Sequence, residues 1–119
     1  MGDYAILGGL TAVHQFCRIG AHAITGGCSK IVQDVPPFMI ADGNPAEIRS
    51  INAIGLQRRG FADEDIRSLK EAYKTIFLRK MTVADALEDL KNNSAELDSE
   101  HPVNILLTFI ESSERGIIR

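Results

Sequence analysis

Hydrophobic residues recur with two different periods along the chain. Over residues 1–36 they return every six positions, and over residues 63–110 they return every three or four. The first positions of the six-residue units are Met1, Leu7, Val13, Ile19, Thr25 and Ile31, and all of them except Thr25 are aliphatic. All fifth positions are small or β-branched: Ala5, Thr11, Cys17, Ala23, Ser29 and Val35. The first third of the chain is therefore a series of hexapeptides.

Six in-phase hexapeptides predict a left-handed parallel β-helix, in which three units form one triangular coil. The first side chain of each unit fills the interior and the fifth fits where space is tight, so the others point outward. An ordinary antiparallel β protein is disfavoured because alternation with a period of two is absent. Pro36 and Pro37 end the repeat, since proline lacks the ladder N–H. Residues 38–40 can add a strand before a turn at 42–45.

Helical spacing begins after this turn. A first helix over residues 63–78 is predicted by apolar residues on one face: Ile66, Leu69, Tyr73, Ile76 and Phe77. Thr82 and Asp85 resemble a capping box and predict a second helix over 83–92.

A third helix is expected to begin near Pro102, which suits a first helical turn, and to end at Gly116. The predicted fold is thus mainly β with an α-helical tail. Its parts are β-helix coils over 1–41, a connecting segment over 42–60 and a small C-terminal helical domain over 61–119.

The composition, 45% hydrophobic and 24% charged, is that of a soluble globular chain. No stretch is long enough for a membrane span and no secretory or transit peptide is visible, which favours the cytoplasm. Cys17 and Cys28 are too few for a disulfide scaffold and complete no zinc pattern. The net charge is −3, and residues 51–62, which carry Arg58 and Arg59 and no acidic residue, form one short basic segment. This predicts a local anion site and not a nucleic-acid surface.

Several motifs together resemble the UDP-N-acetylglucosamine O-acyltransferases, a family within the hexapeptide-repeat acyltransferases. They are LGGLTAVHQFC over residues 7–17, GGCS over 26–29, QDVPP over 33–37, Gly43-Asn44 and GLQRRGF over 55–61. Hexapeptides alone indicate only the superfamily, whereas the GLxRRGF run and the helical tail narrow it.

The resemblance implies a homotrimer in the cytoplasm of a Gram-negative bacterium. Such enzymes move a 3-hydroxyacyl group from acyl carrier protein to the 3-hydroxyl of UDP-N-acetylglucosamine, the first step of lipid A biosynthesis, without a metal or organic cofactor. The family has further coils before the position of Met1, and its proposed general base lies there. We therefore expect a carboxy-terminal portion that is inactive alone. Two alternatives stay open: a non-catalytic trimerising or nucleotide-sugar-binding module, and a hexapeptide acyltransferase with another acceptor, such as an amine.

Three candidate site residues lie in the hexapeptides. By resemblance, His14 lies beside the substrate and supports the general base, a role that suits an imidazole near neutral pH. Gln15 would offer amide hydrogen bonds to the substrate. Gly27 occupies an outward third position, along the family's groove for the acyl chain, where a missing side chain leaves room.

The remaining candidates follow the coils. Guanidinium groups match phosphate oxygens, so Arg58 and Arg59 are expected to bind the diphosphate. Asn52 lies in the family's nucleotide-contacting segment. Lys70 matches a basic family position thought to face the acidic carrier protein. His22 should point outward and is given no role.

Overall fold

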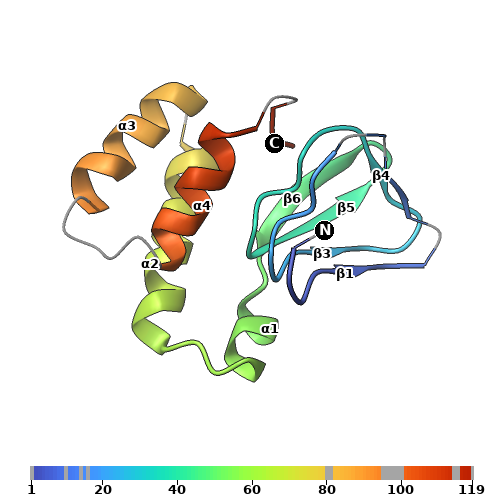
Figure 1. Cartoon of the computed structure of the whole chain (residues 1–119), viewed down its shortest axis with the longest axis horizontal. Coiled ribbons are helices and arrows are strands. Elements are labelled where there is room, and N and C mark those ends of the chain that lie inside the picture. The colour runs from blue at the N-terminus through green and yellow to red at the C-terminus, as the bar shows by residue number, and fades with distance from the viewer. Residues whose placement is uncertain are drawn as a thin grey trace.

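Stacked coils and a group of helices make up the computed structural model of the chain (Figure 1). The structure describes residues 2–9, 11–13, 15, 17–79, 82–94, 101–113 and 116–118, with the side chains of residues 93 and 94 excepted. Within these ranges no helix is long and apolar enough to cross a membrane.

The first part of the chain forms parallel strands that pair across successive coils. In one sheet β1 (Ile6–Leu7) pairs with β3 (Ile24–Thr25), which pairs with β5 (Met39–Gly43). In another, β2 (Ala12–Val13) pairs with β4 (Lys30–Ile31). Ile6 lies opposite Ile24, so the partner residue lies three hexapeptides further along the chain. This confirms the predicted stacking of three-unit coils.

The interior positions of the second coil are buried as expected, whereas those of the first coil are not. Ile19 and Ile31 are 4% and 0% exposed. Leu7 and Val13 are 39% and 38% exposed, although they belong to the same class of position. The reason is that β1 and β2 belong to the first coil and pair only with β3 and β4 of the second, so described coils cover these side chains from one side only.

A strand and a turn follow Pro37 as predicted, but the strand runs on to Gly43 and the turn is confined to residues 44–45. A second strand follows them. β5 turns at Asn44 and Pro45 into β6 (Ala46–Ile51), which pairs with it in antiparallel fashion. A short helix, α1 (Ala53–Arg58), comes next. The connecting segment expected over 42–60 thus contains a hairpin strand and a helix.

The three predicted helices begin where the sequence predicts. The second ends at residue 94 instead of 92, and the third ends at residue 111 instead of 116. The first is α2 (Asp63–Tyr73), whose last part continues as a π-helical turn, η1 (Lys74–Leu78). The second is α3 (Val83–Ser94), where the N–H of Asp85 donates to Thr82 Oγ1 at 3.1 Å. The third, α4 (Pro102–Glu111), ends before Gly116, because residues 116–118 run beside the coils instead.

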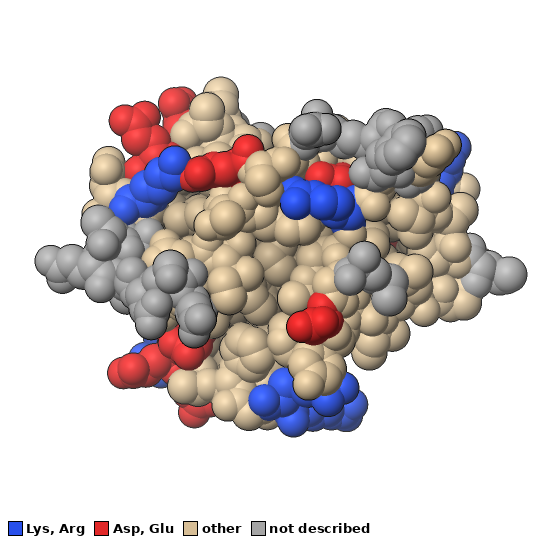
Figure 2. Space-filling model, viewed as in Figure 1, with Lys and Arg blue, Asp and Glu red and all other residues tan. Residues whose placement is uncertain are grey.

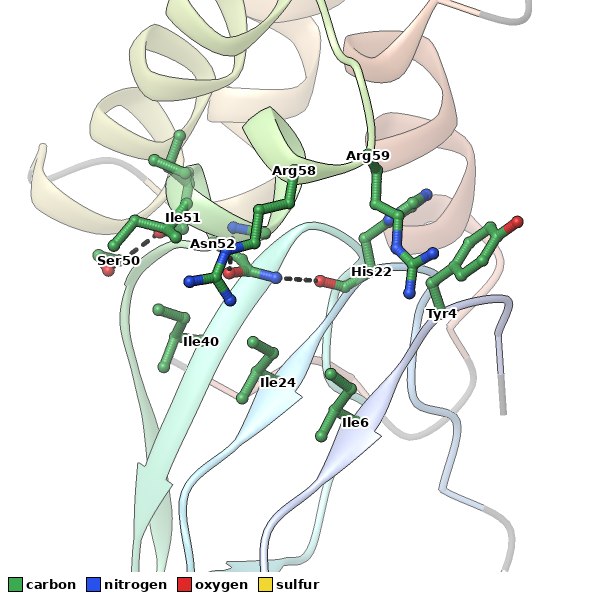
Figure 3. Close-up of a pocket in the computed structure, with 13 residues that line it drawn as sticks. Tyr4, Ile6, His22, Ile24, Ile40, Ser50, Ile51, Asn52, Arg58 and Arg59 are labelled. Atoms are coloured by element: carbon green, nitrogen blue, oxygen red, sulfur yellow. Dashed lines mark hydrogen bonds between the residues drawn. The ribbon is translucent and has the colours of Figure 1, made fainter.

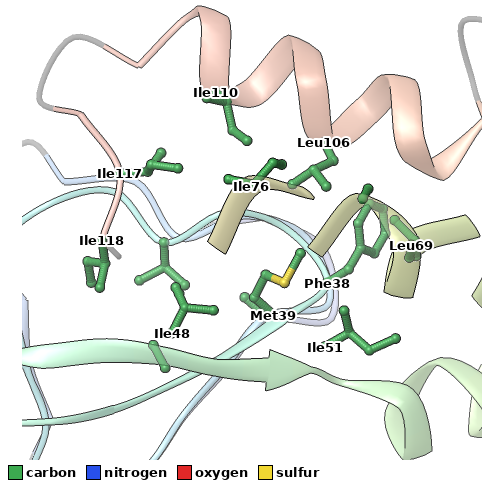
Figure 4. Packing of buried hydrophobic residues seen from close by; sticks show 14 of the residues in the cluster. Phe38, Met39, Ile48, Ile51, Leu69, Ile76, Leu106, Ile110, Ile117 and Ile118 are labelled. Carbon is green, nitrogen blue, oxygen red and sulfur yellow. The ribbon is translucent and has the colours of Figure 1, made fainter. Parts of the chain in front are cut away.

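One hydrophobic core joins the coils to the helices (Figure 4). Buried residues from the coils and the hairpin meet residues from α2, η1 and α4: Phe38, Met39, Ile48, Ile51, Leu69, Ile76, Leu106 and Ile110. Ile117 and Ile118 pack against the same cluster. The helices therefore cover the last coil, and α1 joins the same core through the buried side chain of Leu56.

Asp34 connects the coils to the end of the chain. Its carboxylate is 2% exposed and accepts hydrogen bonds from the backbone N–H of Arg18 at 2.7 Å and the hydroxyl of Ser113 at 2.6 Å. Its backbone bonds in both directions, to Gly116 and to Ile118. This residue therefore links the coils to Ser113 and residues 116–118, which are far away in sequence.

Candidate functional site

A cavity of about 660 Å³ opens between the coils and α1 (Figure 3). Its apolar wall is a column of isoleucines, one from each stacked strand of the sheet: Ile6, Ile24 and Ile40. The opposite side is formed by residues 50–55 with the two arginines that end and follow α1. The cavity thus combines an apolar wall with a cationic rim.

Asn52 fixes α1 against the coils. Its side-chain oxygen accepts from the N–H of Gly55 at 3.2 Å and its amide group donates to the carbonyl of His22 at 3.0 Å. A Cβ on Gly55 would overlap this amide, so the glycine allows the close approach. Asn52 lines the cavity, and the hydrogen bonds shown make it the N-cap that places the arginines.

Arg58 and Arg59 both reach the cavity from the end of α1. Within the described ranges no carboxylate lies at ion-pair distance from either guanidinium. Arg59 instead lies over the ring of Tyr4, with 4.1 Å between the guanidinium carbon and the ring centroid. Figure 2 shows basic side chains at the edge where Figure 1 places α1, and acidic ones mostly over the helical half. The rim is therefore open to an external anion.

Aromatic rings from successive coil corners stack beside the arginines. The ring of His22 lies 5.1 Å from that of Tyr4 and 5.9 Å from that of Phe38, and Phe61 meets His22 edge-on. Burial, and then the positive charge of Arg59, lower the pKa of His22 below 6.5, against the opposing effect of Asp3. The imidazole is therefore held in its neutral form near neutral pH.

Chemically, this arrangement is suited to binding. Two guanidinium groups provide forked donors for an anion with several oxygens, such as a diphosphate. The isoleucine column offers apolar contact next to it. In the described part of the chain no group of three or more His, Cys, Asp or Glu residues is placed to hold a metal ion.

The residues predicted for the site are divided among several places. Asn52, Arg58 and Arg59 come together at the cavity. Gln15 is exposed in a turn and does not line the cavity. Gly27 is exposed just after the C-terminal end of β3 and does not line the cavity either. Lys70 is exposed on α2. His14 lies outside the described residues.

Sequence reasoning missed Tyr4 and His22 as cavity residues, although the repeat contained a signal for them. Both occupy the fourth position of their hexapeptides, one coil of three units apart in the repeat. Both have a positive φ of 59°, as does the neighbouring corner residue Phe38 at 70°. Residues at the same unit position in adjacent coils stack, so a shared aromatic position predicts a column of rings.

Removing the Arg59 charge is expected to raise the pKa of His22. The guanidinium disfavours the imidazolium, so Arg59→Ala removes a cause that lowers this pKa. An NMR titration of the imidazole protons measures the change. The matched control is Arg58→Ala, since Arg58 is not among the charges that shift His22. A His22 pKa that is unchanged in Arg59→Ala, or moves equally in both variants, would contradict the arrangement.

Comparison with known proteins gives a consistent result. A family model described as "Udp N-acetylglucosamine O-acyltransferase; Domain 2" matches residues 34–118. Two curated relatives are each 48% identical to this chain, one from Burkholderia orbicola (strain MC0-3) and one from Burkholderia mallei (strain SAVP1). Both are named acyl-[acyl-carrier-protein]–UDP-N-acetylglucosamine O-acyltransferase. Each match covers 100% of this chain and 46% of the relative.

Solved structures agree with these matches. UDP-N-acetylglucosamine O-acyltransferase from Moraxella catarrhalis RH4 is 36% identical with a TM-score of 0.91, over 100% of this chain and 45% of that one. A related structure from Acinetobacter baumannii is 39% identical with a TM-score of 0.87, over 99% and 45%. The chain thus spans less than half the length of these proteins.

Proposed function

Because the chain belongs to the UDP-N-acetylglucosamine O-acyltransferase family, we propose that it provides the nucleotide-sugar-binding part of such an enzyme. The reaction is transfer of a 3-hydroxyacyl group from acyl carrier protein to the 3-hydroxyl of UDP-N-acetylglucosamine, which begins lipid A biosynthesis. The observation that carries this proposal is the pair Arg58 and Arg59, which face a cavity and have no carboxylate partner among the described residues. In the proposed complex they bind the diphosphate.

The catalytic residues are assigned by resemblance. The general base belongs to coils expected before Met1, and His14 supports it. Gln15 would hydrogen-bond the substrate, and Asn52 would contact the nucleotide from the rim it already positions. Lys70, which is exposed on α2, would face acyl carrier protein.

The proposed assembly is a homotrimer in the cytoplasm, built on left-handed coils with the helices as a C-terminal domain. Support for assembly comes from exposed apolar side chains around the cavity. Ile6 and Ile54 are 54% and 66% exposed there. A neighbouring copy that covered them would remove this apolar surface from water and enclose the cavity.

Gly27→Met is expected to shorten the preferred acyl chain by a few carbons. Gly27 is exposed, and a Cβ there would meet only the backbone of Gly9, at 3.3 Å from its carbonyl oxygen. A longer side chain would therefore extend outward into the proposed acyl groove, where each excluded methylene forfeits about 0.8 kcal/mol. The measurement ranks 3-hydroxyacyl carrier proteins of graded length in a full-length enzyme carrying this segment.

Gly27→Ala is the control for this experiment, because it adds only the Cβ that the site nearly accommodates. It should keep the parent ranking. An unchanged ranking in Gly27→Met at normal activity would show that the acyl chain passes elsewhere.

Acyl transfer tests the function directly, with mass spectrometry of the UDP-sugar product. We expect a full-length enzyme carrying this segment to acylate UDP-N-acetylglucosamine, and the 119-residue chain alone to bind it without transfer. Acylation only of the acceptor with a 3-amino group would favour the amine-acceptor alternative. Absence of transfer to both acceptors in the full-length enzyme would favour a non-catalytic module.

A further inference from the structure

The two cavity arginines differ in how they are held. Arg59 lies over the Tyr4 ring, whereas Arg58 has no ring or carboxylate contact among the described residues. We propose that Tyr4 is a positioning residue, whose ring holds the Arg59 guanidinium at the cavity mouth in the orientation that binds the anionic part of the ligand. The inference rests on the proposed function, in that the ligand is a nucleoside diphosphate sugar.

Tyr4 is well supported for this role although it is 58% exposed. Its ring stacks on His22, and the ring of His22 stacks on Phe38, which is 2% exposed. The backbone N–H of His22 donates to the backbone carbonyl of Asp3 at 2.9 Å, which connects the corner at Tyr4 to the next coil. The column thus runs from the buried core to the cavity rim.

A fixed guanidinium changes binding because an arginine side chain has many rotamers in solution. A ligand that must order it loses part of the binding free energy as side-chain entropy. The Tyr4 ring removes part of that cost beforehand, through the attraction between the cation and the negative face of the ring. Figure 3 shows Arg59 descending from the end of α1 toward Tyr4. Tyr4 thereby links the first coil to the cationic rim.

The first test needs no ligand. In the 119-residue chain, NMR relaxation and the chemical shift of the Arg59 Nε–H group report whether the guanidinium is ordered beside a ring. Tyr4→Leu should give Arg59 the mobility of Arg67, an exposed arginine on α2. Tyr4→Phe retains the ring and should keep the parent signal. An Arg59 signal that is unchanged in Tyr4→Leu would overturn the proposal.

The second test measures the affinity for UDP-N-acetylglucosamine by calorimetry. Tyr4→Leu should weaken binding about 2- to 5-fold, the range for an exposed cation–π contact, and Tyr4→Phe should restore it. The loss should persist in Arg58→Ala and vanish in Arg59→Ala. Phe109→Leu is the matched control, because it removes the ring beneath Arg18, at 4.2 Å, outside the cavity lining.

The outcomes separate the two claims. A Tyr4→Leu loss that is equally large in Arg59→Ala would mean that the ring contacts the ligand itself, and the positioning role would be wrong. If the parent chain does not bind the UDP-sugar, the nucleotide-sugar-binding function proposed for this chain is wrong. The ligand-free comparison of Arg59 then still decides whether Tyr4 holds the guanidinium.

Discussion

Asp34→Ala is expected to lower the free energy of unfolding by about 2–4 kcal/mol, the scale for breaking a buried charged hydrogen-bond group. The carboxylate of Asp34 is almost fully buried and accepts hydrogen bonds from the backbone N–H of Arg18 and the hydroxyl of Ser113. Both donors would lose their partner in the variant. The Arg18 side chain is 44% exposed, so its own 3.5 Å contact adds little. Urea unfolding followed by circular dichroism measures the change.

Two further variants make this result specific. Asp34→Asn keeps an acceptor for the Arg18 N–H and should cost less than Asp34→Ala. Asp42→Ala removes an exposed aspartate from the adjacent coil, whose bond with Ser29 is long at 3.4 Å, and should change stability little. Equal effects of Asp34→Ala and Asp42→Ala would contradict the role of Asp34 as the link to Ser113, Gly116 and Ile118.

Arg58→Ala is expected to weaken UDP-N-acetylglucosamine binding by about 1.5–3 kcal/mol, the range for hydrogen bonds to charged groups. This corresponds to roughly 10- to 150-fold in the dissociation constant. The fold should be unaffected, because Arg58 is exposed and, within the described ranges, forms no ion pair. Calorimetric titration of the variant against the parent measures the loss.

Arg58→Lys should restore part of the affinity, since an ammonium group keeps the charge but not the fork of donors. Arg67→Ala is the control, because Arg67 is also exposed but lies on α2, outside the cavity lining. Unchanged affinity in Arg58→Ala would remove this residue from the site.

The sequence predicted the coils well because their period is a physical consequence of stacking. Each hexapeptide adds one side of the triangle, so residues that fill the interior must recur every six positions. The pairs β1–β3 and β2–β4 follow this rule, because paired residues lie three hexapeptides apart. The exposure of Leu7 and Val13 did not follow from it, because burial also depends on what lies on the open side of the first coil.

The connecting segment was harder to predict, for local reasons. α1 is short and contains Gly55, which lowers helix propensity. Its stability comes from Asn52, whose partners His22 and Phe38 are distant in sequence. Such tertiary contacts override propensity and leave no periodic signal in a single sequence.

The cavity was predicted only in part. The arginine pair was recognisable from its residue types, since adjacent guanidinium groups suit a diphosphate. Its apolar wall depends on the register that brings Ile40 beside Ile24, and this pairing falls after the hexapeptides end. Tyr4 and His22 were predictable in principle from their shared unit position, as the ring column shows.

The proposed nucleotide-sugar site is tested most directly by titrating the ¹⁵N-labelled 119-residue chain with UDP-N-acetylglucosamine and following amide and arginine side-chain NMR signals. We expect saturable shifts at Asn52, Arg58 and Arg59, which line the cavity together. UDP alone should also shift the two arginines, because the diphosphate carries the charge they bind. No saturation at millimolar ligand, or shifts confined to α3 and α4, would contradict binding of the nucleotide sugar at this cavity.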